Sequence, residues 1–382
     1  MKFSVLLPTR NGGCFLRDCI ASILEEPYQD MELVVSDNAN ADETPSILRS
    51  FSSDKRLKVV RLENPVSVTD NWNYALKASS GDYILMMGDD DCLLPGYFKR
   101  TEEVLRKFDN PDCVTYNAYT YVAPDSINGN AQSYYNKLHF RFGPCFKTEG
   151  LISTKIRFSI VKDMYRFRVR IPLNMQTTLV SRKASGSIEC GMFQPPFPDH
   201  YALNALLLNA KRWVYVPENL LIIGVSSKSF GHFVYSNQQD KGLNYLGIGA
   251  DFKGRLPGNE LVNYMYIWLE LLKIKYHDKL RSIKISRSNY VRRQVYHWYI
   301  QYKSKGISSK ELKKRLCALS LTDSLGLCLF FFDRESWLRF WRMFLPRKSN
   351  KIHKGWFGFC PVDNVLNIKD FRAWVGTQRK SK

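Results

Sequence analysis

The sequence predicts an α/β protein: a parallel sheet with helices on its faces, followed by a mainly helical and basic C-terminal region. Short apolar runs alternate with segments of helical period over residues 3–87, which is the pattern of βαβ units and a parallel sheet. The run 83–87 ends in three consecutive carboxylates, and open α/β sheets bind ligands just beyond such strand ends. The net charge of +20 is concentrated after residue 240.

Each element is predicted from its period and from the residues that bound it. Apolar runs between turn formers predict strands at 3–7, 31–35, 57–62 and 83–87. Apolar residues at helical spacing predict helices at 15–24, 44–51 and 68–78. Further strands are predicted at 177–181, 213–216 and 220–223, and further helices at 203–208, 259–276 and 290–302. Because polar loops follow the strands, we expect these loops to meet on one edge of the sheet.

The composition is that of an ordinary globular protein. The chain has 382 residues, of which 45% are hydrophobic and 24% charged. Its 9 cysteines are scattered and show no paired zinc spacing, which indicates reduced thiols in a cytosolic setting. The apolar run at the start is too short for a signal peptide, and no run is long enough to cross a membrane.

The acidic cluster Asp89, Asp90 and Asp91 is the strongest local signal. Three adjacent carboxylates at a buried strand end repel one another, and a bound cation would relieve that cost. Oxygen ligands of this kind suit Mg²⁺ or Mn²⁺, which commonly take one or two carboxylates together with substrate phosphates. The alternative is a solvated acidic turn without a ligand.

Three sequence blocks together carry a resemblance to a known family. They are 5–11 (VLLPTRN), 34–38 (VVSDN) and 81–91 (GDYILMMGDDD), in this order. In that arrangement the chain resembles family 2 glycosyltransferases with the GT-A fold, a Rossmann-like mixed sheet with flanking helices. The resemblance covers about residues 1–235. It implies a nucleotide-sugar binding half at 1–112 and an acceptor half at 113–235, and leaves the basic region 236–382 unexplained.

The resemblance implies a set of donor-binding residues on the first loops. Asp37 matches the family's base-binding aspartate, although an Asx-turn without a ligand is the alternative. Asn73 matches a family asparagine, although it could equally be a helix-surface amide. The expected donor-binding residues are Pro8, Thr9, Arg10, Asp37, Asn73 and Asp89.

The family's acidic signature is commonly Asp-X-Asp followed by a further Asp, and this chain departs from it at Gly88. Aligned on the flanking residues, Asp90 corresponds to the metal ligand and Asp91 supports the metal shell. Asp89 then faces the ribose. The resemblance therefore implies Mn²⁺ or Mg²⁺ as cofactor. Because Gly88 replaces the first acid of the signature, the resemblance does not fix the affinity for the metal.

Transfer with inversion needs a base that takes the proton from the acceptor hydroxyl. Asp199 occupies the family's position for this base, although it could instead cap the following helix. His200 is the second candidate. Lys228 or His232, in the loop after 220–223, could reach diphosphate oxygens or the metal.

The last third of the chain has its own chemistry. Residues 241–382 hold 29 Lys and Arg against 10 Asp and Glu. A segment at 333–345 places Trp337 and Trp341 on an apolar helical stripe beside basic residues, which fits a helix lying on an anionic membrane surface. A helix packed on the catalytic domain fits equally well.

The sequence therefore predicts a metal-dependent, inverting glycosyltransferase. Its expected donor is a nucleotide-sugar, best matched by a UDP-sugar, and its expected acceptor is a glycan or lipid-linked saccharide. The expected location is the cytoplasm or the cytosolic face of a membrane. Two rivals remain: a nucleic-acid-binding protein that uses the basic region, and an inactive family member that only binds sugar nucleotide. No recognised nucleic-acid-binding motif is present, and nucleic acid is not expected as a partner.

Overall fold

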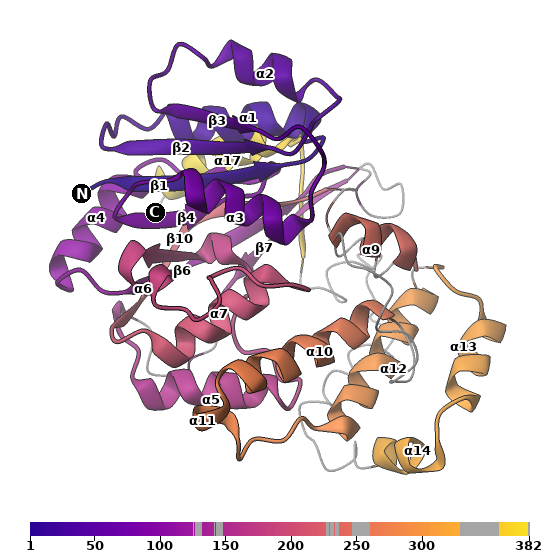
Figure 1. Ribbon diagram of the computed structural model, residues 1–382. Helices are drawn as coiled ribbons and strands as arrows, with labels where there is room; N and C mark the ends of the chain where they lie inside the picture. The colour runs from indigo at the N-terminus through magenta and orange to yellow at the C-terminus, as the bar shows by residue number, and fades with distance from the viewer. Residues whose placement is uncertain are drawn as a thin grey trace.

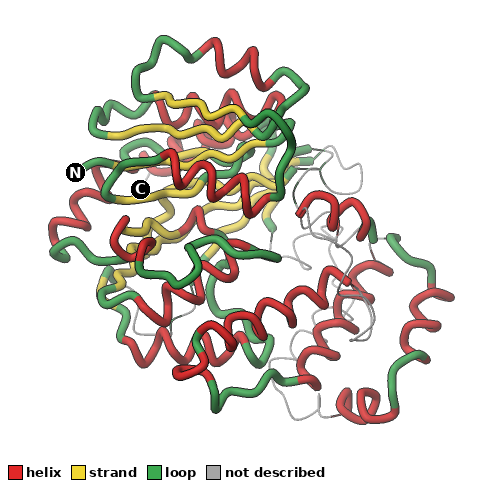
Figure 2. Tube along the Cα trace, in the orientation of Figure 1, coloured by secondary structure: helices red, strands yellow, loops and turns green. Residues whose placement is uncertain are grey.

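The computed structural model describes residues 1–124, 126, 132–140, 142, 148–226, 229, 233, 237–246, 260–303, 305–328 and 359–380 (Figure 1). A twisted sheet occupies one half of the molecule, and helices from the second half of the chain occupy the other (Figure 2). The predicted α/β class with flanking helices is confirmed. No helix in these ranges is long and apolar enough to cross a membrane.

The sheet has 11 strands in the described part of the chain, and its first half is parallel. The order β3-β2-β1-β4 arises from three successive βαβ units, as the alternation of periods predicts. The strands are β1 Phe3–Thr9, β2 Met31–Asp37, β3 Leu57–Arg61, β4 Tyr83–Met86, β5 Cys92–Leu93, β6 Cys113–Val122, β7 Ser133–Leu138, β8 Gly150–Leu151, β9 Thr178–Ser181, β10 Trp213–Val225 and β11 Cys360–Val362.

The second half of the sheet is mixed. Strand β9 runs antiparallel to both β4 and β6, so it joins the two halves. The prediction of separate strands at 213–216 and 220–223 is wrong, because β10 is one strand that pairs with β6 along its whole length. Its register shifts on both sides of Asn219, and these bulges absorb Pro217 without ending the strand.

Helices cover both faces of the sheet and bury a separate apolar cluster on each. Alternate residues of β1 divide between the clusters, with Leu6 in one and Val5 and Leu7 in the other. The helices are α1 Gly13–Leu24, α2 Thr44–Ser50, α3 Val68–Ala78, α4 Tyr97–Lys107, α5 Thr154–Met164, α6 Arg182–Gly186, α7 Pro198–Asn209, α9 Gln239–Leu246, α10 Glu260–Lys275, α11 His277–Leu280, α12 Arg287–Lys303, α13 Ser309–Cys317, α14 Leu321–Cys328 and α17 Ile368–Lys380.

The C-terminal helices share the core of the first domain. Trp268 and Leu272 of α10 and Tyr290 of α12 are fully buried in the same cluster as α7. In the described part of the chain, α13 and the end of α12 form a small separate cluster with Trp298, Ile307 and Leu312. The helical character predicted for this region is confirmed for α10 and α12.

The end of the chain returns to the sheet. Strand β11 pairs antiparallel with β7, and α17, yellow in Figure 1, lies beside α1 behind the sheet. A separate core on this side contains Phe371 and Val375 of α17 together with Cys92 and Ile222. Residues predicted to belong only to a C-terminal region thus contact the first domain directly.

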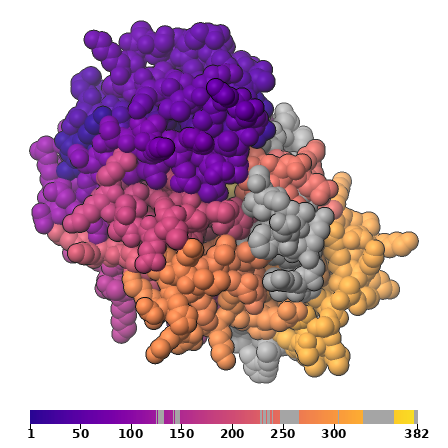
Figure 3. Space-filling model, in the orientation of Figure 1, coloured from indigo at the N-terminus to yellow at the C-terminus, as the bar shows by residue number. Residues whose placement is uncertain are grey.

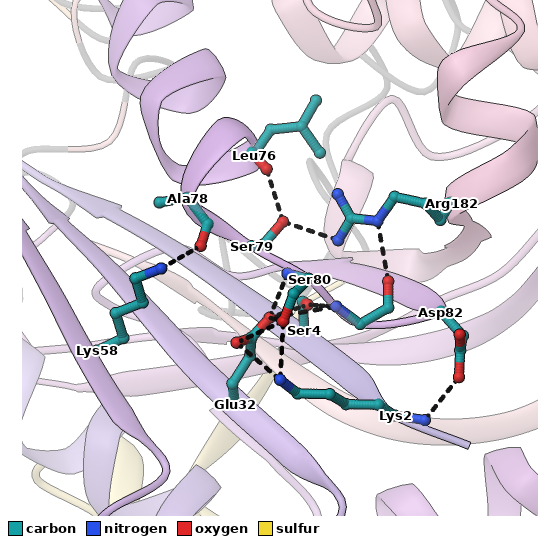
Figure 4. A network of polar contacts seen from close by, with 11 residues as sticks. Lys2, Ser4, Glu32, Lys58, Leu76, Ala78, Ser79, Ser80, Asp82 and Arg182 are labelled. Atoms are coloured by element: carbon teal, nitrogen blue, oxygen red, sulfur yellow. Dashed lines mark hydrogen bonds and ion pairs between the residues drawn. The ribbon is translucent and has the colours of Figure 1, made fainter.

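A polar network at the amino edge of the parallel strands holds the turn before β4 (Figure 4). Glu32 accepts hydrogen bonds from Ser4 Oγ at 2.6 Å, from the backbone N–H of Ser80 at 2.5 Å and from Lys2 Nζ at 3.1 Å. Burial by itself would raise the pKa of Glu32, but these hydrogen bonds outweigh it and lower the pKa to about 2. The glycine of the Gly81-Asp82 motif is needed because a Cβ there would lie 2.7 Å from the backbone N of Ser4.

Glu32→Gln should lower the free energy of unfolding at pH 7 by up to about 3 kcal/mol, the equivalent of its pKa shift. A carboxyl whose pKa is lowered on folding stabilises the folded protein at pH values above the pKa that the group has in the unfolded chain. That stability is lost as the pH falls from about 4.5 towards 2. Urea unfolding at pH 7 and at pH 3 measures both effects. Glu63→Gln, at an exposed position, is the matched control, and an equal loss for both variants would contradict the role of the network.

Candidate active site

Strand register brings the first two predicted loops together. Thr9 is opposite Asp37 in the β1–β2 pair, and Asp37 is opposite Arg61 in the β2–β3 pair. All three residues stand at the carboxyl ends of parallel strands, which is where the sequence placed the site. Pro8 and Arg10 flank Thr9, and the Arg10 side chain is exposed.

The Asp37 side chain is 2% exposed and both of its oxygens have partners. Oδ2 pairs with Arg61 Nη1 at 2.7 Å, and Oδ1 accepts from the backbone N–H and the amide of Asn40 at 3.0 and 2.7 Å. Asn38 stabilises the same loop, since its Oδ1 accepts from the N–H of Val66 at 2.8 Å. The contacts with Asn40, three residues on, hold the carboxylate within its own loop, and base binding by Asp37 stays a prediction. Arg61 was not predicted as a site residue, although it lies within the strand predicted at 57–62 and is the last residue of β3.

The acidic cluster forms a tight loop after β4, which we call the acid loop (residues 88–91). Asp91 is 1% exposed, and its two oxygens accept from the backbone N–H groups of Gly88 at 2.6 Å and Gly224 at 3.0 Å. Burial, together with the charge of Asp90, raises its pKa. With both oxygens engaged by backbone amides, Asp91 ties the loop to β10. Its predicted metal role stays a prediction.

Asp90 is held by two hydroxyls from the segment after β10. Its Oδ2 accepts from Ser226 Oγ at 3.0 Å and from Ser229 Oγ at 3.2 Å. Burial and the neighbouring Asp89 carboxylate raise the pKa of Asp90 to about 7. Neither serine was predicted, because nothing in the sequence near residue 226 indicates a carboxylate 136 residues earlier.

Asp89 faces the end of β1. Its Oδ2 accepts a hydrogen bond from Thr9 Oγ1 at 2.6 Å, which joins two residues that were predicted separately as donor-binding. Gly12 lies against both, since a Cβ at that position would be 2.6 Å from Thr9 Oγ1 and 2.7 Å from Asp89 Oδ2. The loop after β1 and the acid loop are therefore packed together.

The oxygen donors around Asp90 fit a divalent cation. Asp89 and Asp90 are adjacent carboxylates, and a cation would relieve the repulsion and desolvation that raise the pKa of Asp90. The described residues contain no group of three or more His, Cys, Asp or Glu arranged to hold a metal ion. A site of one or two carboxylates completed by substrate phosphates suits Mg²⁺ or Mn²⁺.

Backbone contact fixes the acid loop from the other side. A Cβ at Gly224 would lie 1.8 Å from the carbonyl oxygen of Asp90, so β10 and the loop touch through their main chains. At Gly88, where the family commonly has an acid, a Cβ would lie 2.9 Å from Asp91 Oδ2. The glycine therefore gives the Asp91 carboxylate room to reach the N–H of residue 88.

Asn73 contacts the segment that precedes Asp199. Its Nδ2 donates to the carbonyl of Phe193 at 3.2 Å, and the neighbouring Trp72 packs edge-on against the Phe193 ring at 5.2 Å. These contacts dock the 191–197 segment on α3. Asn73 thus connects the two halves of the domain, and donor binding by Asn73 stays a prediction.

Asp199 stands in the first turn of α7, 26% exposed. The helix cap is Phe197, so the alternative that Asp199 caps the helix is wrong. A carboxylate in a first helical turn is favoured by the helix dipole, but burial raises the pKa of Asp199. His200 packs between the rings of Phe197 and Trp268 at 4.9 and 5.6 Å, and burial lowers its pKa. His200 is thus held as a neutral packing residue.

Tyr245 lies on α9, and the sequence did not single it out. Desolvation raises its pKa, and the charges of Asp89, Asp90 and Asp199 raise it further. Carboxylates of both the acid loop and α7 thus act on the charge of this phenol, although the Tyr245 residue is 42% exposed. Helix α9 packs against α3 and α10 at this edge of the sheet (Figure 1).

Two predicted features cannot be placed. Lys228 and His232 lie outside the described residues, although Ser226 and Ser229 of the same segment reach Asp90. The helix predicted at 333–345 also lies outside them.

The fold is of the GT-A class. It has a parallel half-sheet that ends in carboxylates, and a mixed half that supplies a further acid. Residues 4–168 match the model of Glycosyl transferase family 2, and this part of the chain belongs to that family. The resemblance drawn from the sequence is confirmed.

Individual relatives support the same assignment. Glycosyltransferase GlyG of Streptococcus pneumoniae is 28% identical over 132 residues, which is 34% of this chain and 42% of that protein. A GalNAc(5)-diNAcBac-PP-undecaprenol beta-1,3-glucosyltransferase of Campylobacter jejuni is 34% identical over 97 residues, 25% of this chain and 31% of that protein. The matched segment thus spans less than half of either relative. Among solved structures, TarS 1–349 of S. aureus in complex with UDP-GlcNAc has a TM-score of 0.52 at 14% identity, covering 85% of this chain and 78% of that one.

Proposed function

We propose that the chain is a metal-dependent, inverting glycosyltransferase that moves a sugar from a nucleotide-sugar to a saccharide or lipid-linked saccharide. The observation that carries the proposal is the acid pair at the carboxyl edge of the sheet, with Asp89 bound to Thr9 and Asp90 bound to Ser226 and Ser229, together with the further acid Asp199 in the first turn of α7. An acid pair for a metal-bound diphosphate and a separate acid for the acceptor are the groups that this reaction needs.

The donor is proposed to lie across the strand ends, with its base near Asp37 and Thr9 and its ribose near Asp89. A UDP-sugar is favoured, because the structural relative of the same fold is described with UDP-GlcNAc. Asn40 and Arg61 hold the Asp37 carboxylate in one orientation, so any base that meets it finds a fixed acceptor. A lipid-linked acceptor is in keeping with the name of the Campylobacter relative.

In the reaction, Asp199 takes the proton of the acceptor hydroxyl as that oxygen attacks the anomeric carbon. The bond from that carbon to the diphosphate oxygen breaks on the opposite face, so a single displacement inverts the configuration. The raised pKa of Asp199 makes its carboxylate a stronger base, provided that it is ionised. Asp90, with Asp89, would hold a divalent cation, which would neutralise the charge that develops on the diphosphate.

A thermal-shift screen tests this proposal. UDP, GDP, UDP-glucose, UDP-GlcNAc and GDP-mannose are each compared with MnCl₂ and with EDTA, and binding ligands are followed by an assay of donor hydrolysis. We expect a rise in Tm with uridine ligands that needs the metal, and slow hydrolysis of one donor. Binding without hydrolysis of any donor would favour an inactive sugar-nucleotide-binding protein, and no binding at all would contradict the proposal.

We also propose that the C-terminal helices rest on an anionic membrane surface. Helices α13 and α14 form the orange lobe at the far edge of the molecule from β3 (Figure 3). Leu321 and Leu325, one helical turn apart on α14, are 78% and 61% exposed. The exposed cations nearby in sequence are Lys303, Lys305, Lys310, Lys313 and Lys314. Two acids of this stretch, Glu311 and Asp323, are neutralised by ion pairs with Arg315 and Arg287. Apolar insertion and lipid attraction would then act together.

The wild-type protein should pellet with vesicles that contain phosphatidylglycerol and not with neutral phosphatidylcholine vesicles, and binding should weaken with salt. Leu321→Glu with Leu325→Glu should reduce binding by about tenfold, because each change removes apolar burial and adds repulsion. Leu366→Glu is the matched control, since Leu366 is 72% exposed but lies beside β11. Absence of wild-type pelleting at low salt would end this proposal, and tight binding to a DNA oligonucleotide would favour the nucleic-acid rival.

A further inference from the structure

The chain leaves the acid loop through β5, a strand of two residues that is held on both sides. The N–H of Leu93 donates to Ser22 Oγ on α1 at 3.0 Å, and its carbonyl accepts from Arg372 Nε on α17 at 2.9 Å. Leu93 also pairs with Leu221 of β10. The main chain two residues after Asp91 is thus fixed by the last helix of the protein.

Arg372 makes further contacts that lock it in this position. Its Nη1 pairs with Glu25 Oε2 at 2.5 Å and its Nη2 donates to the carbonyl of Ser22 at 3.5 Å. The side chain is 16% exposed. One planar guanidinium therefore joins α17, the end of α1 and β5, which a single ammonium group could not reproduce.

An aromatic and apolar core lies next to the contact between Arg372 and β5. Phe371, fully buried, stacks on Tyr121 with ring centroids 4.9 Å apart, and Trp374 packs on Tyr135 at 5.0 Å. Cys92 and Ile222 belong to the same core and face each other across the β5–β10 pair. Both strands that fix Asp91 are therefore packed on α17.

We propose that α17 positions the acid loop, and that Arg372 is the positioning residue. The helix lies outside residues 4–168, the part that matches the family model. If β5 shifts, the Asp91 contact with Gly224 is strained, and Asp90 moves relative to Ser226 and Ser229. The functional consequence rests on the proposed role of Asp90 in donor binding, whereas the structural link does not.

Two cysteines report the link directly. Cys92 is 1% exposed and lies beneath α17. It lines a cavity of about 240 Å³ between α1 and α17. Cys113, at the start of β6, is fully buried. Because the Cys92 side chain is buried, its alkylation in the wild type should be very slow. The measurement is the iodoacetamide labelling of each cysteine peptide by mass spectrometry in the full chain.

In Arg372→Gln, labelling of Cys92 should accelerate by about tenfold or more while Cys113 stays protected, as expected for a local opening. The Mn²⁺ concentration that half-saturates UDP binding should rise by about three- to tenfold, and saturating Mn²⁺ should restore binding. Arg372→Lys should be intermediate in both measurements. Lys369→Gln, an exposed cation on the same helix, is the control and should resemble the wild type.

Unchanged labelling of Cys92 in Arg372→Gln would overturn the proposal. Equal acceleration at Cys92 and Cys113 would also overturn it, because it would show only a loss of global stability. Selective opening at Cys92 with an unchanged Mn²⁺ requirement would refute the positioning role and leave α17 a structural helix. If the wild type binds no nucleotide with any metal, the donor-site function fails, and selective opening at Cys92 still supports the link between Arg372 and the acid loop.

Discussion

Asp90→Asn should abolish the metal-dependent part of nucleotide binding, with a loss in UDP affinity of about 100-fold in the presence of Mn²⁺. The amide keeps the size of the side chain and one oxygen for the Ser226 and Ser229 hydroxyls, but it removes the charge that a cation needs. Titration calorimetry with UDP and MnCl₂, repeated in EDTA, measures the effect. Asp30→Asn, at the amino edge of the sheet, is the control.

The same variant should not be less stable than the wild type in the absence of metal. A carboxyl whose pKa is raised on folding lowers the stability of the folded state, and this cost grows as the pH rises from 3.8, its ordinary pKa, to about 7 and is fully present above that. Asp90→Asn removes that cost, and Tm at pH 8 in EDTA should equal or exceed that of the wild type. UDP binding that is unchanged by both the mutation and EDTA would refute the metal role of Asp90.

Asp199→Asn should retain UDP binding and lose donor hydrolysis by about 10²–10⁴-fold, the usual contribution of one general base. Residual activity should no longer rise with pH, whereas the wild-type rate should rise through the raised pKa of Asp199 as the carboxylate ionises. The side chain accepts a local hydrogen bond from the N–H of His200 at 2.8 Å and lies 4.0 Å from His200 Nε2, so the substitution should leave the fold intact.

His200→Gln separates the two candidate bases. Because the imidazole is packed between Phe197 and Trp268, this variant should lower Tm more than it lowers the rate per folded molecule. If instead His200→Gln loses hydrolysis by more than 100-fold while Asp199→Asn stays within a few-fold of wild type, the assignments are reversed.

The ends of helices could be predicted where residues next to them in the sequence mark the end, and not elsewhere. Helix α3 was predicted at its observed bounds, and the structure shows that Ser67 caps it by accepting from the N–H of Asp70. Helix α1 begins two residues before its predicted start, because Gly12 caps it without a side-chain bond. Helix α7 begins at Pro198, before the predicted 203, because it is buried on nearly all sides and has no apolar stripe to mark its first turn.

The sequence by itself determined the order of the βαβ units and the position of Asp37 and the three acids at strand ends, because both follow from local period and from the direction of parallel strands. Only the tertiary structure decided what those acids contact. Arg61 reaches Asp37 through strand register, Ser226 and Ser229 reach Asp90 from the far end of β10, and Arg372 reaches β5 from the last helix. Such contacts depend on how distant segments pack, and the spacing of apolar residues along the sequence does not indicate which distant side chains will be in contact.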